Sequence, residues 1–167
     1  MAYIRYLEGL SPNLTLPLAR RWLSGSGRLR FAGETILSRH AQAEDRALVE
    51  QTLAACMAKG AYYRVCSMIE ALTRIADPAS SGLLVRTFEQ IPYAWARPRI
   101  LQALRACGAH ELPALARESL WDCESEAREV AVQHVRRDAD ARVRLEAMRD
   151  DALEDERVRA AADIRLR

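Results

Sequence analysis

The sequence AREVAVQHV at residues 127–135 matches RVRAAADIRL at 157–166 in the order of its side-chain types. Each segment has an arginine, a small residue three positions later and an apolar residue four positions after that: Arg128, Ala131, Val135 and Arg159, Ala162, Leu166. This spacing places all three residues on one face of an α-helix. The small residue lets a neighbouring helix approach, and the apolar residue fills the adjoining space. The two segments are therefore predicted to be equivalent helices of a repeat.

The repeat extends toward the N-terminus. Arg97, Ile100 and Leu104 have the same spacing, and the step from Arg97 to Arg128 equals the step from Arg128 to Arg159. Earlier matches are weaker and have slightly longer steps: EAL at 70–72 with QAL at 102–104, and Arg30, Gly33, Leu37 with Leu72. Apolar residues recur at intervals of three and four, and no segment alternates long enough to predict a strand. The short connections require successive helices to be antiparallel.

These patterns predict an all-α chain of five antiparallel helix pairs in a single domain over 1–167. The first repeat, within 1–42, is weak, and the repeats over 43–167 are clearer. The first helices of the pairs are expected at 13–24, 43–58, 79–90, 109–121 and 138–150. The second helices are expected at 28–40, 61–76, 94–107, 124–136 and 154–166.

The leading arginine of each unit lies at the edge of the packed face. Its stem can cover apolar surface while its head reaches an acidic turn of an adjacent unit. Such turns occur in WDCESEAR at 121–128 and in LEDERVR at 153–159. Acidic residues there also favour the start of the following helix.

The segments SEAREVAVQHV at 125–135 and EDERVRAAADIRL at 154–166 resemble HEAT-like repeats of the armadillo type. The likeness is greatest to the short bacterial repeats first described in phycobilin lyases (PBS-lyase-like repeats). The resemblance implies a short right-handed α-solenoid with outer first helices and inner second helices. Lyase activity does not follow from a packing signature.

The composition is that of a globular protein, with 50% hydrophobic and 29% charged residues and a net charge of +2. No apolar run approaches the length of about 18 residues that a membrane-spanning helix needs, so no span is predicted. The N-terminal sequence MAYIRYLEGL lacks the pattern of a secretory signal, and the expected compartment is the cytoplasm.

No catalytic residue, metal ligand or cofactor is predicted. The four cysteines form no CxxC pair and are expected to be buried reduced thiols: Cys56, Cys66, Cys107 and Cys123. The HEAT-like deoxyhypusine hydroxylases need several His-Glu pairs, whereas this chain has the single pair His110–Glu111. HEAT-like alkylpurine DNA glycosylases use tryptophans and an acidic residue over a basic groove. Trp95, Trp121 and Asp122 are residues of these types. Trp121, however, is predicted to end an outer helix, away from such a groove.

The stretch YAWARPR at 93–99 is the leading candidate for a binding surface. The repeat alignment places Tyr63 and Trp95 at the same position of adjacent units, about 10 Å apart. Pro98 favours the first turn of a helix and sets its start near Trp95. Aromatic residues and arginine are enriched at interface hot spots. The predicted partner-binding residues are Tyr63, Arg64, Tyr93, Trp95, Arg97, Arg99 and Arg128.

The first hypothesis is a non-enzymatic module that binds one protein partner through its inner helices, with an inhibitor or immunity-type protein as one form. In a second interpretation, the aromatic rings only pack on neighbouring loops and Arg97 is structural. The alternative function is nucleic-acid binding, with seven arginines on phosphates: Arg20, Arg21, Arg28, Arg30, Arg64, Arg97 and Arg99.

Overall fold

The computed structural model describes residues 6–7, 9–25, 27 and 29–167. Over these residues it contains ten α-helices and three short 3₁₀ helices and no strand. The predicted all-α class is therefore confirmed, and each of the ten expected helices is present close to its expected range.

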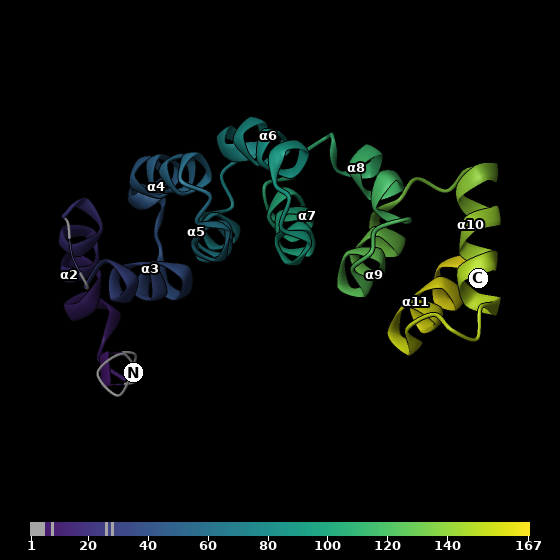
Figure 1. Cartoon of the computed structure of the whole chain (residues 1–167), viewed down its shortest axis with the longest axis horizontal. Coiled ribbons are helices and arrows are strands. Elements are labelled where there is room, and N and C mark those ends of the chain that lie inside the picture. Colours follow the sequence, from purple (N-terminus) through teal and green to yellow (C-terminus); the bar gives the residue numbers. More distant parts are fainter. Residues whose placement is uncertain (1–5, 8, 26, 28) are drawn as a thin grey trace.

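The helices alternate between two layers of an elongated arc (Figure 1). The outer helices, on the convex side, are α2 (Pro12–Ser24), α4 (Arg46–Ala58), α6 (Ser81–Gln90), α8 (Leu112–Ser119) and α10 (Ala139–Asp150). The inner helices, on the concave side, are α3 (Leu29–His40), α5 (Tyr62–Ile75), α7 (Arg97–Ala106), α9 (Ser125–His134) and α11 (Glu156–Leu166). The 3₁₀ helices η1 (Ala43–Asp45), η2 (Pro78–Ser80) and η3 (Ala94–Ala96) directly precede α4, α6 and α7.

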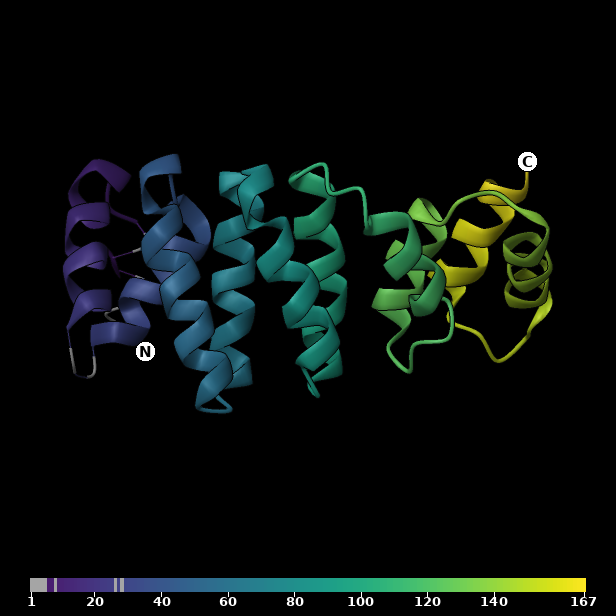
Figure 2. The ribbon, with the colours of Figure 1, turned by 90° about the horizontal axis from the view of Figure 1, so that it is seen from above.

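Each outer helix packs on the inner helix that follows it, and each inner helix also contacts the next inner helix. Contacts between consecutive outer helices are sparser, which is consistent with their position on the convex side. Seen from above, the pairs follow one another along the long axis (Figure 2). This arrangement brings side chains at equivalent positions of α3, α5, α7, α9 and α11 onto one face.

Two proline residues explain why α7 and α8 begin later than a simple periodicity predicts. Pro98 and Pro113 each lie in the first turn of their helix. A helix that began at 94 or 109 would need these residues to donate a backbone hydrogen bond to the carbonyl four positions earlier, and proline has no N–H. The predicted helix at 109–121 is therefore shorter, and residues 94–96 form the separate turn η3.

The predicted packing face is buried in the units of α7 and α9, whereas in α11 Ala162 is buried and Leu166 is only partly buried. Ile100, Leu104, Ala131, Val135 and Ala162 are fully buried, as the spacing of small and apolar residues requires. The buried side chains form a larger cluster from α2 to α9 and a smaller one from α8 to α11.

The two clusters meet at α8. Leu112 and Leu115 belong to the larger cluster, whereas Ala116 and Leu120 belong to the smaller one. The core of the first three helix pairs therefore extends into α8 and α9, and the last pair packs only on the smaller cluster.

Cys56, Cys66 and Cys107 are buried free thiols, as expected, but Cys123 is exposed. The expectation for Cys123 was wrong because this residue lies in the turn between α8 and α9 instead of on a helix face. In the part of the chain that the structure describes, no helix combines the length and the apolarity that a membrane crossing needs.

Candidate interaction surface on the inner helices

Two of the predicted site arginines connect neighbouring units. Arg97 on α7 donates from Nη1 to Oδ2 of Asp122 at 2.8 Å, and Arg128 on α9 donates from Nε to Oε2 of Glu154 at 2.9 Å. Both carboxylates lie in the acidic turns that the sequence singled out, and both are largely buried. These hydrogen bonds raise the pKa of Arg97 and of Arg128. The predicted contact of the leading arginine with the next acidic turn is therefore present in both units.

Arg64 also bonds a carboxylate of a neighbouring unit, but that unit precedes it in the sequence instead of following it. It donates from Nε to both carboxylate oxygens of Glu34 on α3, each at 2.9 Å, and also from Nη2. Glu34 is fully buried, and Arg30 lies 3.6 Å from the same carboxylate. The hydrogen bond to Glu34 raises the pKa of Arg64. Arg64 thus holds α5 to the preceding inner helix.

The aromatic side chains Tyr63 and Trp95 are exposed at the starts of two consecutive inner helices. Their exposed fractions are 68% and 58%, and neither belongs to a core cluster. Tyr63 lies in the first turn of α5, and Trp95 lies in η3 directly before α7. Tyr93 differs from them because it is half-buried and packs against the larger core.

Arg99 lies beside these rings and orders the stretch around Trp95. Its Nη1 donates to the carbonyl oxygen of Trp95 at 2.7 Å, and its Nε lies 3.1 Å from Oε1 of Glu70 on α5. Both Arg99 and Glu70 are partly exposed. Arg99 therefore links the start of α7 to the C-terminal half of α5, and its side chain stays partly exposed.

Phe31 on α3 is an additional exposed aromatic residue, outside the set predicted from the sequence. The step from Phe31 to Tyr63 equals the step from Tyr63 to Trp95, and Phe31 is 38% exposed. The first repeat is only weakly similar to the others, so the equivalence of Phe31 was not recognised. A search of the sequence for aromatic residues at that step would have found it. We call Phe31 on α3, Tyr63 on α5 and Trp95 in η3 the aromatic row.

The row does not continue into the last two inner helices. The positions that follow Trp95 at the repeat step are Glu126 and Arg157. The remaining large exposed tryptophan, Trp121, lies in the turn after α8, where the guanidinium carbon of Arg144 on α10 sits 5.3 Å from its ring centroid. Trp121 is thus held by a cation–π contact outside the aromatic row.

The seven arginines of the nucleic-acid alternative are mostly engaged within the chain. Five of them have carboxylate partners: Arg20 with Asp45 and Glu44, Arg30 and Arg64 with Glu34, Arg97 with Asp122, and Arg99 with Glu70. Arg21 is exposed near the end of α2, and Arg28 lies outside the described residues. Charge that is already neutralised by a carboxylate attracts a phosphate weakly.

Comparison with protein-family models, curated proteins and solved structures finds no match to this chain. Within the described residues, the His, Cys, Asp and Glu side chains form no group of three or more that could hold a metal ion. The chemistry that this surface offers is that of exposed aromatic rings beside a partly exposed guanidinium.

Proposed function

We propose that the chain is a short α-solenoid of HEAT-like repeats that binds one protein partner through its inner helices. The observation that carries the proposal is the exposure of Tyr63 at the start of α5 and of Trp95 directly before α7, where Arg99 donates to the Trp95 carbonyl oxygen. Rings at such positions contribute little to the core, and they present apolar area together with hydrogen-bonding groups. This combination is typical of interface anchors.

The rings offer enough apolar area to anchor a partner. An aromatic side chain covers about 150–250 Å² when it is fully buried. At roughly 25 cal/mol per Å², covering the exposed parts of Tyr63 and Trp95 contributes on the order of 5 kcal/mol before the costs of association. Phe31 extends the same surface toward the first repeat.

In this proposal the site arginines have two different roles. Arg64, Arg97 and Arg128 keep adjacent units in register, because each is tied to a largely buried carboxylate. Arg99 is the arginine that contacts the partner directly. Tyr93 directly precedes η3 and fixes this end of it by packing against the larger core cluster. The arginines of the first group therefore position the surface.

An inhibitor or immunity-type protein that covers a toxin or an enzyme is one form of such a module. We place the interaction in the cytoplasm, where the four free thiols fit the reducing conditions.

The test compares capture of a partner from a lysate of the native host by three forms of the full chain. We expect the wild type and Trp121→Ala to retain the same protein, and Tyr63→Ala/Trp95→Ala to lose it without loss of helical circular dichroism. Trp121→Ala is the matched control, because Trp121 is as exposed as Trp95 and lies outside the aromatic row. Equal capture by all three forms, or unfolding of the double variant, would contradict the proposal.

A further inference from the structure

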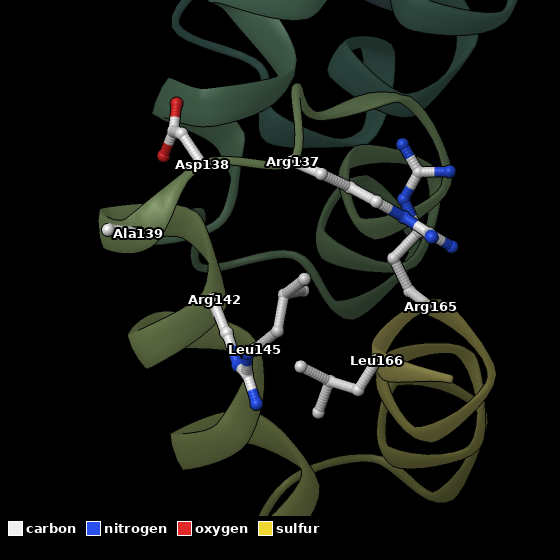
Figure 3. A pocket seen from close by; sticks show the side chains of 7 residues that line it. All are labelled: Arg137, Asp138, Ala139, Arg142, Leu145, Arg165 and Leu166. Carbon is white, nitrogen blue, oxygen red and sulfur yellow. The ribbon is translucent and has the colours of Figure 1, made fainter.

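A cavity of about 500 Å³ lies between α10 and α11, beside the connection from α9 to α10 (Figure 3). Its lining combines positively charged and apolar side chains: Arg137, Asp138, Ala139, Arg142, Leu145, Arg165 and Leu166. Leu145 and Leu166 approach each other from the two helices, and Arg137 and Arg165 lie along one side. We call this space the arginine cavity. It is separate from the aromatic row, which lies on α3, α5 and η3.

Arg137 and Arg165 both line this cavity, and their side chains extend toward each other in Figure 3. Arg165 donates from Nη2 to the carbonyl oxygen of Val135 at 2.8 Å, while its Nε is buried without a hydrogen-bond partner. Burial, together with the charge of Arg137, lowers the pKa of Arg165. Arg137 makes no ion pair or side-chain hydrogen bond within the described part of the chain. The cavity therefore holds two adjacent like charges.

The nearby carboxylates do not neutralise this pair. Asp138 directs its carboxylate to Arg117 on α8 and also accepts from the backbone N–H of Ala141 at 3.0 Å. Arg142 forms a solvent-exposed pair with Glu146 at 3.0 Å, one turn further along α10. Both carboxylates are thus bonded to groups other than Arg137 and Arg165.

A second cavity, of about 510 Å³, is lined by residues of α9 and α11 and shares Arg137 and Arg165 with the first. Its carboxylate, Glu129, lies 4.0 Å from Arg157 on α11. Close by, the Nε2 atom of His134 is buried without a hydrogen-bond partner. Burial is the main cause that lowers the pKa of His134, and the charges of Arg105 and Arg165 lower it further. The region around the ends of α9 and α11 is therefore positively charged beyond the single cavity.

We propose that the arginine cavity binds a phosphate group. Arg137 and Arg165 donate to its oxygens, and Leu145 and Leu166 pack against the small organic body of a phosphate ester. Two guanidinium groups side by side match a doubly charged tetrahedral anion, and guanidinium binds phosphate through paired N–H donors. The anion offsets the repulsion between the two arginines.

The experiment measures binding of phenyl phosphate and of inorganic phosphate to the full chain by calorimetry, at constant ionic strength set with sodium chloride. The variant is Arg137→Gln, because Arg137 makes no intramolecular bond whose loss would weaken the fold. The control is Arg136→Gln, which makes the same change in net charge at an exposed neighbouring residue. We expect Arg137→Gln to weaken phosphate binding at least tenfold. Arg136→Gln should keep the wild-type affinity.

Thermal unfolding adds a second readout. Without phosphate, Arg137→Gln should melt at or slightly above the wild-type temperature, because the variant removes a charge that opposes Arg165. With phosphate, the wild type should gain stability and the variant should not.

The relative affinities identify the occupant. Tighter binding of phenyl phosphate assigns an ester, whereas equal binding that still depends on Arg137 assigns the free ion. Equal weakening by both substitutions would show charge attraction without a defined site and would overturn the proposal. If neither phenyl phosphate nor inorganic phosphate binds the wild type, or if only an oligonucleotide binds, the proposal is overturned as well.

Discussion

The first three helix pairs and the last two share a backbone plan but present different inner surfaces. From α2 to α7 the core belongs to the larger cluster, and the inner helices carry the aromatic row. From α8 to α11 a smaller cluster supports a charged inner surface with the arginine cavity at its end. Core positions follow the repeat because they must pack, whereas exposed positions are free to differ. One scaffold can therefore support separate binding surfaces.

The difference extends to the contacts between units. Arg128 in the last two pairs, and Arg97 at the boundary on α7, reach forward to buried acidic residues in the turn before the next inner helix, while Arg64 on α5 reaches back to Glu34. Arg159 occupies the same repeat position as Arg128 but forms no ion pair with any residue that the structure describes. This difference between equivalent arginines provides matched pairs for mutagenesis.

The largest expected effect is in thiol reactivity. We expect Cys123 to react with an aromatic disulfide reagent about 100-fold faster than the other three thiols, because it alone is exposed. Burial raises the pKa of Cys56, Cys66 and Cys107, which lowers their thiolate fraction further. Mass spectrometry of the labelled chain gives the order of reaction.

All three protected thiols belong to the larger cluster, so their slow labelling also reports how often the first half opens. Rapid labelling of all four cysteines in native conditions would show that the larger cluster does not protect them.

The second prediction concerns Arg64→Ala. Removal of this side chain leaves the fully buried Glu34 with only the longer contact to Arg30, so we expect a loss of about 3 kcal/mol in the free energy of unfolding. Denaturant unfolding measures it. Arg86→Ala, on the exposed side of α6, is the control and should change stability by less than about 0.5 kcal/mol. Equal stability of the two variants would show that the α3–α5 ion pair contributes nothing.

The third prediction compares Arg128→Ala with Arg159→Ala. The first substitution removes the bonds to Glu154 and to the carbonyl oxygen of Asp122, and we expect it to cost about 2 kcal/mol. The second removes an exposed side chain at the equivalent position and should cost less than about 0.5 kcal/mol. Both values follow from urea unfolding curves. A larger loss in Arg159→Ala would contradict the assignment of the paired arginines as the connectors between units.

The smallest effect is a dependence of stability on acid pH. Burial of Glu154 opposes its ionisation. The hydrogen bond from Arg128, a backbone hydrogen bond and nearby arginine charges favour ionisation and together outweigh burial, so the pKa of Glu154 is lowered. Ionised Glu154 therefore stabilises the fold above its unfolded pKa of about 4.3, and this contribution disappears as the pH falls through the lower folded value. Melting temperatures from pH 7 to pH 3 should fall less steeply in Glu154→Gln than in the wild type.

The exposed Glu156→Gln serves as its control and should follow the wild type. Parallel curves for wild type and Glu154→Gln would show that protonation of Glu154 does not contribute to the loss of stability at acid pH.

The sequence predicted the parts of the structure that depend on local periodicity. The constant step from Arg97 to Arg128 to Arg159 located α7, α9 and α11, and the acidic turns around Asp122 and Glu154 were identified as arginine partners. It placed Cys123 incorrectly, because exposure in a turn depends on how two helices are joined. It did not reveal the pair of Arg64 with Glu34, since that contact joins residues of different units that share no motif.

The sequence also did not predict the arginine cavity. Arg137 and Arg165 come from a connection and from a helix end, and their approach depends on how α10 leaves α9. Side-chain direction at such a connection is set by packing, for which the sequence has no periodic signal.

The central claim is that a partner covers the aromatic row, and fluorine NMR of the chain labelled with 5-fluorotryptophan tests it most directly. Three tryptophans give three signals, from Trp22, Trp95 and Trp121, and single substitutions to phenylalanine assign them. When the captured partner is added, we expect the Trp95 signal to shift and lose its sensitivity to solvent, while the Trp121 signal stays in place. A bound partner that shifts Trp121 and leaves Trp95 unchanged would contradict the account.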